Sequence, residues 1–171
     1  TLRRLTRSHR QVIPEVSDNI SDHSFRVAII GMLLANLEKA DENKVLKMCL
    51  FHDLAEARTG DANFVNQQYA NLHEQQAIND QMAGLPIAEE IKSILLEYEE
   101  RESKEAIISK DADKIDQMIL QQEYFYKDTT NGKIWQDHTE KSLITDSAQA
   151  ISQKIRTVNP FEWLYQALDK K

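Results

Sequence analysis

The sequence predicts an all-α fold of about six to eight helices in a single domain over residues 1–171. Only four glycines and three prolines occur in the chain, so long helices can form without interruption. Apolar residues recur at steps of three and four along most of the sequence, which is the spacing of helices with one buried face. No stretch shows the strong alternation of a half-buried strand.

The first long helix is expected to follow a basic opening segment, residues 1–19. Ser21 is a favourable N-cap residue, and Asp22 favours a helix start because of the helix dipole. Beyond them the apolar positions recur with helical period. The buried face of this helix is therefore predicted to hold Phe25, Ala28, Ile29, Met32, Leu33 and Leu37.

A second helix is expected from near Asp41, ending before Gly60. It is apolar nearly all round, which is typical of a central buried helix. The residues concerned are Val45, Leu46, Met48, Cys49, Leu50 and Phe51. We interpret Cys49 as a packing residue within this helix rather than as a nucleophile or ligand.

The rest of the chain predicts helices over residues 72–82, 87–98, 103–126 and 145–158. Residues 62–71 lack periodicity and are expected to form a loop across the site, and residues 128–132 a turn. Residues 134–141 have no clear assignment. A short last helix is expected after Asn159-Pro160, with apolar residues that either dock on the body or serve an interface: Phe161, Trp163, Leu164, Tyr165 and Leu168.

The composition limits the possible partners. Twenty-eight acidic and 21 basic residues give a net charge of −7, which disfavours a nucleic-acid polymer, because binding a phosphate backbone requires a basic face. A single nucleotide remains compatible, since a bound cation can receive a phosphate. The longest apolar run, residues 27–35, is far too short to cross a membrane. The single cysteine excludes an intrachain disulfide and favours a reducing, cytoplasmic location.

One stretch carries candidate metal chemistry. His52 and Asp53 end the buried apolar run, Glu56 lies one helical turn further on, and Gly60-Asp61 follows. Buried polar side chains require partners, and one divalent metal ion would serve all of them. The alternative is a helix end where the histidine caps carbonyl groups and the acids face water.

Two other positions extend this candidate site. His23 lies in the first turn of the first long helix, where its ring either points toward the second helix or forms a hydrogen bond in the core. Asp111 and Asp113 fall inside an otherwise apolar helix, and at most one of them is expected to face the core. The alternative is an exposed charged turn in which Lys110 and Lys114 are salt-bridge partners.

The order His23, His52-Asp53, Asp113 resembles the signature of the HD-domain metal-dependent phosphohydrolases. The surrounding residues are similar to the 5′-deoxynucleotidase branch, which removes phosphate from deoxyribonucleoside 5′-monophosphates. The three similar stretches are Ser21–Ala28, His52–Asp61 and Lys110–Leu120. The resemblance covers roughly residues 1–126, with the signature-bearing part at about 20–126, and it implies an HD-domain helical bundle.

The resemblance also implies a set of roles. The metal ligands would be His23, His52, Asp53 and Asp113, holding one Mn²⁺, Co²⁺, Fe²⁺, Mg²⁺ or Zn²⁺ ion. Glu56 would handle the attacking water. Asp61 would hold the sugar 3′-hydroxyl or the network around it, unless it only caps the turn after Gly60.

The resemblance is less specific about the residues that would contact the phosphate and the base of a substrate. Arg26 is either a phosphate ligand or a salt-bridge partner. The branch usually has a tryptophan fourteen residues before the first ligand histidine, where this chain has His9. His9 is a candidate to stack on a base, and Arg7 or Arg10 to reach the phosphate. The family resemblance also implies a homodimer.

Other readings of the sequence remain. One is an HD hydrolase of a different phosphorylated small molecule, and another is a metal-containing helical module that binds a partner without turnover. Ala57 stands where alarmone hydrolases carry an acidic residue, and no Gly-Tyr-Pro sequence follows as in cyclic-dinucleotide phosphodiesterases. The intact Glu56 favours an enzyme over a structural module.

Overall fold

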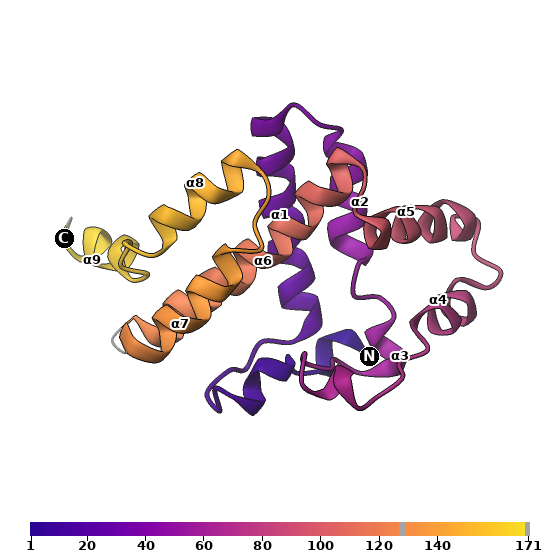
Figure 1. Ribbon diagram of the computed structural model, residues 1–171, viewed down its shortest axis with the longest axis horizontal. Helices are drawn as coiled ribbons and strands as arrows, with labels where there is room; N and C mark the ends of the chain where they lie inside the picture. Colours follow the sequence, from indigo (N-terminus) through magenta and orange to yellow (C-terminus); the bar gives the residue numbers. More distant parts are fainter. Residues whose placement is uncertain (127–128, 170–171) are drawn as a thin grey trace.

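Three helices form the centre of the fold. A computed structural model describes residues 1–126 and 129–169. In it α1 (Ile20–Glu38), α2 (Glu42–Phe51) and α6 (Lys104–Phe125) pack pairwise against one another (Figure 1). These helices or their ends carry the three signature stretches, so the central packing brings those stretches together.

The other helices flank this centre. α4 and α5 lie on the α2 side, and α7 and α8 lie along α6 on the other side (Figure 1). Their bounds, with the single-turn α3 and three short 3₁₀ helices, are α3 (Glu56–Thr59), α4 (Glu74–Met82), α5 (Ala88–Glu100), α7 (Thr129–Glu140), α8 (Asp146–Ile155), α9 (Glu162–Leu168), η1 (Leu2–Arg4), η2 (Ser8–Gln11) and η3 (Asn66–Gln68). The described residues form no β-strand, and eight α-helices remain once α3 is set aside. The predicted all-α class is confirmed.

Side-chain caps fix the starts of α1, α2, α6 and α8. Asp41 caps α2, Ser103 caps α6 and Thr145 caps α8, each accepting a hydrogen bond from a backbone N–H of the first turn. The predicted cap of α1 was wrong by two residues. Asn19, not Ser21, accepts the hydrogen bond from the Asp22 N–H, at 3.0 Å.

The predicted buried face of α1 was wrong. Of that set only Ala28 is buried, and the other five side chains are between 40% and 65% exposed. These five, which we call the α1 ridge, are Phe25, Ile29, Met32, Leu33 and Leu37. The buried face of α1 instead carries Val27, Leu34 and Ala35. It approaches α2 closely at Gly31, where a Cβ would lie 2.5 Å from Cys49 Sγ. Cys49 itself is buried, as predicted.

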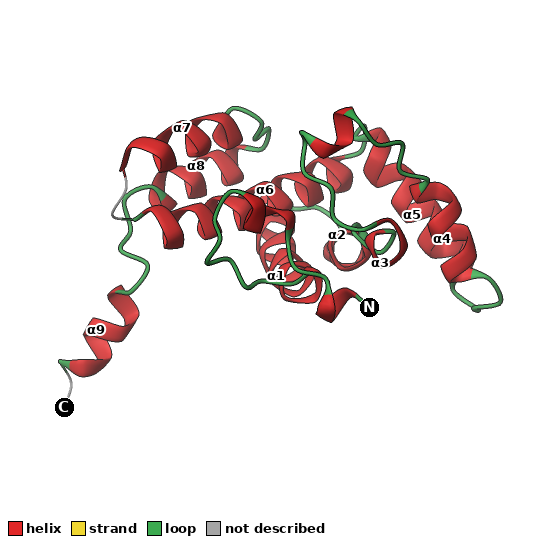
Figure 2. Cartoon of the chain, turned by 90° about the horizontal axis from the view of Figure 1, so that it is seen from below, coloured by secondary structure: helices red, strands yellow, loops and turns green. Residues whose placement is uncertain are grey.

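The C-terminal part also differs from expectation. Residues 129–132, predicted as part of a turn, begin α7, while residue 128 lies outside the described residues. α9 projects away from the other helices (Figure 2). Docking on the body was one of the two roles expected for the apolar side chains here, and an interface was the other. All five are exposed in the single chain: Phe161, Trp163, Leu164, Tyr165 and Leu168.

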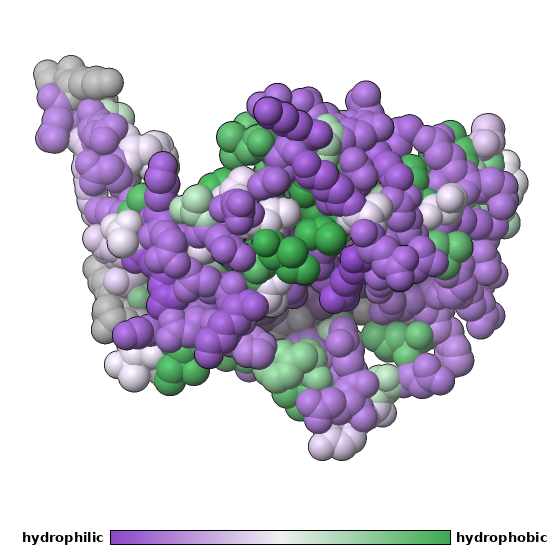
Figure 3. All heavy atoms as spheres, turned by 45° about the horizontal axis from the view of Figure 1, so that its top comes forward, coloured by the Kyte–Doolittle hydropathy of each residue, from purple (hydrophilic) through white to green (hydrophobic). Residues whose placement is uncertain are grey.

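The face shown in Figure 3 is mostly hydrophilic, with separate hydrophobic patches. Among residues 1–126 and 129–169, no helix combines the length and the apolar character needed to cross a bilayer.

Candidate metal centre

Four side chains converge where the first turn of α1, the end of α2 and the middle of α6 meet. Asp53 Oδ2 lies 3.3 Å from His23 Nε2 and 3.2 Å from His52 Nε2. Asp113 Oδ1 lies 3.5 Å from His23 Nε2. One ligand atom each from His23, His52 and Asp113 falls within a mutual distance of 4.8 Å. Donors bound to one first-row ion at about 2.0–2.2 Å lie about 3 Å apart, so this spacing suits one cation.

Each of the two histidine rings is oriented by a hydrogen bond at the nitrogen that faces away from the centre. His23 Nδ1 lies 2.7 Å from a carboxylate oxygen of Asp116, and His52 Nδ1 lies 2.8 Å from the Cys49 carbonyl oxygen. Both partners only accept hydrogen bonds, so each Nδ1 carries a proton and Nε2 is the nitrogen that each ring turns toward the centre. The two Nε2 atoms are 3.2 Å apart. A proton on one of the two nitrogens, or a cation bound to both, accounts for this close approach.

The pKa shifts of His23 and Asp113 also indicate that the centre favours a positive charge. Burial opposes a charge on His23, but hydrogen bonds to Asp116 and Asp53 outweigh it and raise its pKa to about 9. Burial likewise opposes ionisation of Asp113, but Lys110 and Lys114 hold its pKa below its ordinary value. The donor set therefore attracts positive charge, a proton in the metal-free protein or a cation. We conclude that the residues fit a divalent metal ion.

Glu56, at the start of α3, is the neighbouring acid. Its Oε2 atom is buried and has no hydrogen-bond partner among the described residues. Burial, followed by the negative charges of Asp53 and Asp61, raises the pKa of this carboxyl group to about 10. A carboxyl group this easily protonated beside a metal centre has the character of a general acid or base.

The N-terminal segment is fastened over the centre by two acids. Arg7 NH1 lies 3.1 Å from Asp53 Oδ2 and 3.6 Å from Asp61 Oδ2. Ser8 donates to Asp61 twice, from its backbone N at 2.7 Å and from Oγ at 3.0 Å. Both oxygens of Asp61 are thus occupied by Ser8, so Asp61 belongs to the network around the site.

Comparison with known proteins places this arrangement in a family. A family model described as HD domain matches residues 1–156. The chain belongs to the HD domain family. The match includes all four side chains at the centre of this HD domain and the segment that covers them.

Two curated relatives of this HD domain carry an activity in their names. The protein named 5′-deoxynucleotidase HDDC2 from Dictyostelium discoideum is 31% identical over 123 residues, which are 64% of this chain and 64% of the relative. The protein named 5′-deoxynucleotidase hdd1 from Schizosaccharomyces pombe is 33% identical over 128 residues, 70% of this chain and 63% of the relative. The chain therefore spans somewhat less than two thirds of either relative.

Solved structures share the fold over most of its length. A conserved hypothetical protein from Pyrococcus furiosus is 30% identical with a TM-score of 0.73, covering 92% of this chain and 94% of the other. A predicted metal-dependent phosphohydrolase from Magnetospirillum magnetotacticum has a TM-score of 0.73 at 21% identity, covering 90% and 83%. At that lower identity the likeness concerns the fold alone.

Arg26 was expected either to contact the phosphate or to form a salt bridge, and it forms salt bridges. Its Nε lies 2.7 Å from Asp116 Oδ1, and its NH2 lies 2.6 Å from Asp18 Oδ2. Arg26 does not line the pocket at the metal centre. The expectation that it contacts a phosphate is therefore corrected, and its role is to hold Asp116 behind His23.

Asp111 and Asp113 are both buried, although at most one was expected to face the core. The two side chains serve different neighbours because α6 is covered on both sides. Asp113 faces the metal centre, whereas Asp111 accepts hydrogen bonds from the Thr145 backbone N and Oγ1, each at 2.7 Å. Asp111 therefore fixes the start of α8.

The metal centre forms the floor of a cavity of about 540 Å³, large enough for a small-molecule ligand. Residues 62–65 and Gln67 line one side, which confirms the expected loop across the site. Sequence analysis missed Asp116, Tyr98 and Trp135. Asp116 follows Asp113 by one helical turn, and the tendency of metal-binding histidines to pair with a carboxylate would have pointed to it.

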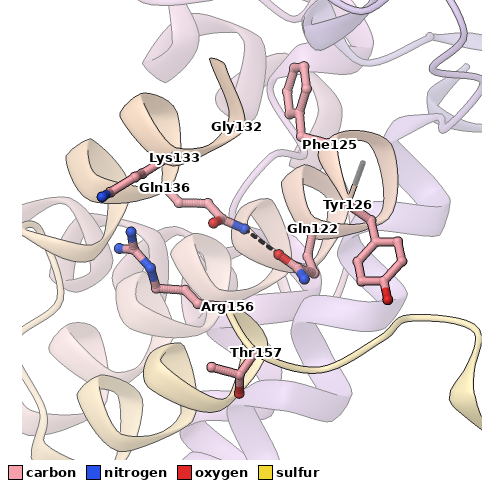
Figure 4. A pocket seen from close by; sticks show the side chains of 8 residues that line it. All are labelled: Gln122, Phe125, Tyr126, Gly132, Lys133, Gln136, Arg156 and Thr157. Carbon is pink, nitrogen blue, oxygen red and sulfur yellow. Dashed lines mark hydrogen bonds between the residues drawn. The ribbon is translucent and has the colours of Figure 1, made fainter. Parts of the chain in front are cut away.

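A smaller cavity of about 230 Å³ lies between the end of α6, α7 and the end of α8 (Figure 4). Its polar groups are largely engaged with one another. Gln136 donates to Gln122 at 2.9 Å, and Arg156 pairs with Asp137 and Glu140. No acid or histidine lines it among the described residues, so it does not compete as a catalytic site.

Proposed function

We propose that the chain is a metal-dependent phosphomonoesterase that hydrolyses deoxyribonucleoside 5′-monophosphates to deoxynucleoside and phosphate. The observation that carries this proposal is the cluster of His23, His52, Asp53 and Asp113 on the floor of a nucleotide-sized cavity, with Glu56 beside it. The names of the two curated relatives support the choice of substrate.

The proposed metal ligands are His23 and His52 through Nε2, and Asp53 and Asp113 through carboxylate oxygens. This mixed donor set suits Mn²⁺, Co²⁺, Fe²⁺, Mg²⁺ or Zn²⁺, and ligand type alone does not select among them. When bound, the ion supplies a water of lowered pKa and neutralises negative charge on the phosphate.

Glu56 is the proposed proton carrier. Water attacks phosphorus while the bond from phosphorus to the 5′-oxygen breaks. Glu56 receives the proton from the water and returns it to the leaving 5′-oxygen, so the reaction needs no protein nucleophile. The buried Oε2 atom of Glu56, which has no hydrogen-bond partner among the described residues, supports this role. The positive charge of a bound metal ion would favour the ionised form of Glu56, which is the form that accepts the proton.

Three cations at the cavity are proposed to receive the phosphate oxygens. Lys110 and Lys114 lie 3.5 Å and 3.7 Å from Asp113 Oδ2, and both line the cavity. Arg7 also lines it, held by Asp53 and Asp61. We assign Asp61 to the positioning of this segment through Ser8 rather than to the sugar 3′-hydroxyl.

The direct test is phosphate release from a panel of ribo- and deoxyribonucleoside monophosphates, measured colorimetrically after chelation and after adding back each metal. Metal-dependent release from deoxyribonucleoside 5′-monophosphates is expected. Release only from other phosphomonoesters would favour the alternative HD hydrolase. No release from any phosphomonoester would favour a metal-containing module without turnover.

We also propose a homodimer formed through the α1 ridge. Its five large apolar side chains follow one face of α1 and are exposed in the single chain. An exposed apolar patch of this kind marks an interaction surface, and a two-fold dimer would bury the same patch on both copies.

A cytoplasmic location is a further proposal, supported by the one free and buried cysteine, Cys49. Cell fractionation with an antibody against the native protein would test it.

A further inference from the structure

Two aromatic rings from distant parts of the chain meet in the wall of the large cavity. His9 belongs to η2 and Trp135 to α7, and their ring centroids are 5.4 Å apart at an angle of 63° between the planes. Both residues line the cavity. We propose that this aromatic corner, His9 with Trp135, is the subsite for the nucleobase of the substrate; the inference rests on the proposed function.

Packing, rather than polar contacts, holds the corner in place. His9 Nδ1 has no hydrogen-bond partner among the described residues, and Nε2 has only a 3.5 Å contact with Gln117 Nε2. Trp135 packs on Phe125 with centroids 6.0 Å apart, beside a small apolar cluster beneath η2 and α6. The indole is therefore fixed between the apolar core and the cavity, as a stacking surface needs to be.

The His9 ring is also uncharged. Burial first, and then the nearby charge of Arg7, lowers the pKa of His9 to about 4. A neutral imidazole beside an indole offers π surface without competing for the phosphate. Three cations of the cavity, Arg7, Lys110 and Lys114, lie instead at the metal centre.

The aromatic corner lies beside the metal centre, about one helical turn further along α6. Gln117, which contacts His9, follows Asp113 by four residues on α6, about 6 Å along the helix axis. His9 also follows directly on Arg7 and Ser8, which are fastened to Asp53 and Asp61. A nucleoside monophosphate has the same order, with the phosphate at one end, the sugar between and the flat base at the other end.

The chemistry of stacking explains why this subsite would be tolerant. Every base has a π face, so stacking on aromatic side chains binds bases with little regard to their hydrogen-bonding edges. The corner therefore predicts loose base preference. Both rings of the corner, His9 of η2 and Trp135 of α7, offer a π face of this kind.

Trp135 can report on the subsite directly, because the chain has only two tryptophans and Trp163 is 70% exposed on α9. In the Glu56→Gln/Trp163→Phe protein with Mg²⁺, dAMP is expected to change Trp135 emission saturably, whereas deoxyribose 5-phosphate and inorganic phosphate leave it unchanged. Binding of dAMP in equilibrium dialysis without any change in emission would overturn the aromatic corner and leave the proposed function standing. Absence of dAMP binding would overturn both.

Kinetics of single variants give an independent readout. Trp135→Ala is expected to raise KM for deoxyribonucleoside monophosphates about ten-fold with kcat unchanged, and Trp135→Phe to keep KM near the native value. KM for deoxyribose 5-phosphate should not move. Trp163→Ala is the matched control and should change neither constant. Equal increases in KM for both substrates, or none for either, would overturn the subsite even where phosphate release proves the proposed function.

Discussion

His23 Nε2 and His52 Nε2 face each other across 3.2 Å, each ring held in place by a hydrogen bond on its opposite nitrogen. The bond behind His23 comes from a carboxylate, and the bond behind His52 from a main-chain carbonyl. This difference matters, because only the carboxylate can be removed by a side-chain substitution. The orientation of the His23 ring can therefore be tested by mutating Asp116, whereas that of the His52 ring cannot be tested in this way.

Asp116→Asn should weaken metal binding by about 10- to 100-fold. The amide no longer provides the anionic acceptor for His23 Nδ1, so the ring loses its fixed tautomer and part of its basicity. Isothermal titration of the metal-free protein with Zn²⁺ or Mn²⁺ measures the change. Arg26→Gln removes the residue that holds Asp116 but leaves the bond from His23 in place, so it should weaken metal binding less. If both variants bind metal as the native protein does, Asp116 does not position His23.

Glu56→Gln should lower kcat by at least about 100-fold while metal content and the unfolding temperature stay near native values. Glutamine preserves the shape of the side chain but cannot accept the proton. Phosphate release and elemental analysis on the same preparation provide the two measurements. Glu74→Gln is a suitable control, since Glu74 also lines the cavity but lies outside the metal centre. Full activity in Glu56→Gln would rule out the proton-carrier role.

Asp61→Ala should release the N-terminal segment. It removes the acceptor of two hydrogen bonds from Ser8, and a hydrogen bond to a charged group contributes about 1.5–3 kcal/mol of stability. Trypsin should then cleave after Arg7 faster, because Arg7 is only 11% exposed while the segment is held. Ser8→Ala keeps the backbone donor and should give an intermediate rate. Unchanged cleavage would mean that other contacts fasten the segment.

His9→Gln should reduce the sensitivity of the fold to mild acid. Because the pKa of His9 is about 4 when folded and about 6.5 when unfolded, the unfolded chain binds the extra proton between these values. The stability is therefore complete above pH 6.5 and is lost as the pH falls toward 4, roughly 2 kcal/mol of it by pH 5. Urea unfolding at pH 7 and pH 5 should show a smaller loss in His9→Gln than in the native protein.

The control for this pH effect is His73→Gln, because His73 is exposed. It should lose stability between pH 7 and pH 5 as the native protein does. An equal loss in His9→Gln would show that His9 is not a buried neutral ring.

The sequence was more informative about the metal centre than about the packing around it, for physical reasons. His23, His52-Asp53 and Asp113 stand in recognisable stretches, and the structure brings those side chains together. Asp116 was missed because its role depends on which ring nitrogen of His23 faces inward. The α1 ridge was misassigned because α1 is apolar on two faces, and helical period alone does not show which of the two faces packs on α2 and α6.

Leu33→Glu should abolish the homodimer, or weaken it at least about 100-fold, because it places a carboxylate in the middle of the α1 ridge and a two-fold dimer would bury both copies. Trp163→Glu tests the alternative, since the exposed aromatic residues of α9 are the other candidate interface. Leu96→Glu, on exposed α5 surface outside both regions, controls for the added charge. Sedimentation velocity across a concentration series distinguishes the outcomes. A dimer lost in Trp163→Glu but kept in Leu33→Glu would assign the interface to α9, and a native chain that sediments as a monomer would contradict the dimer itself.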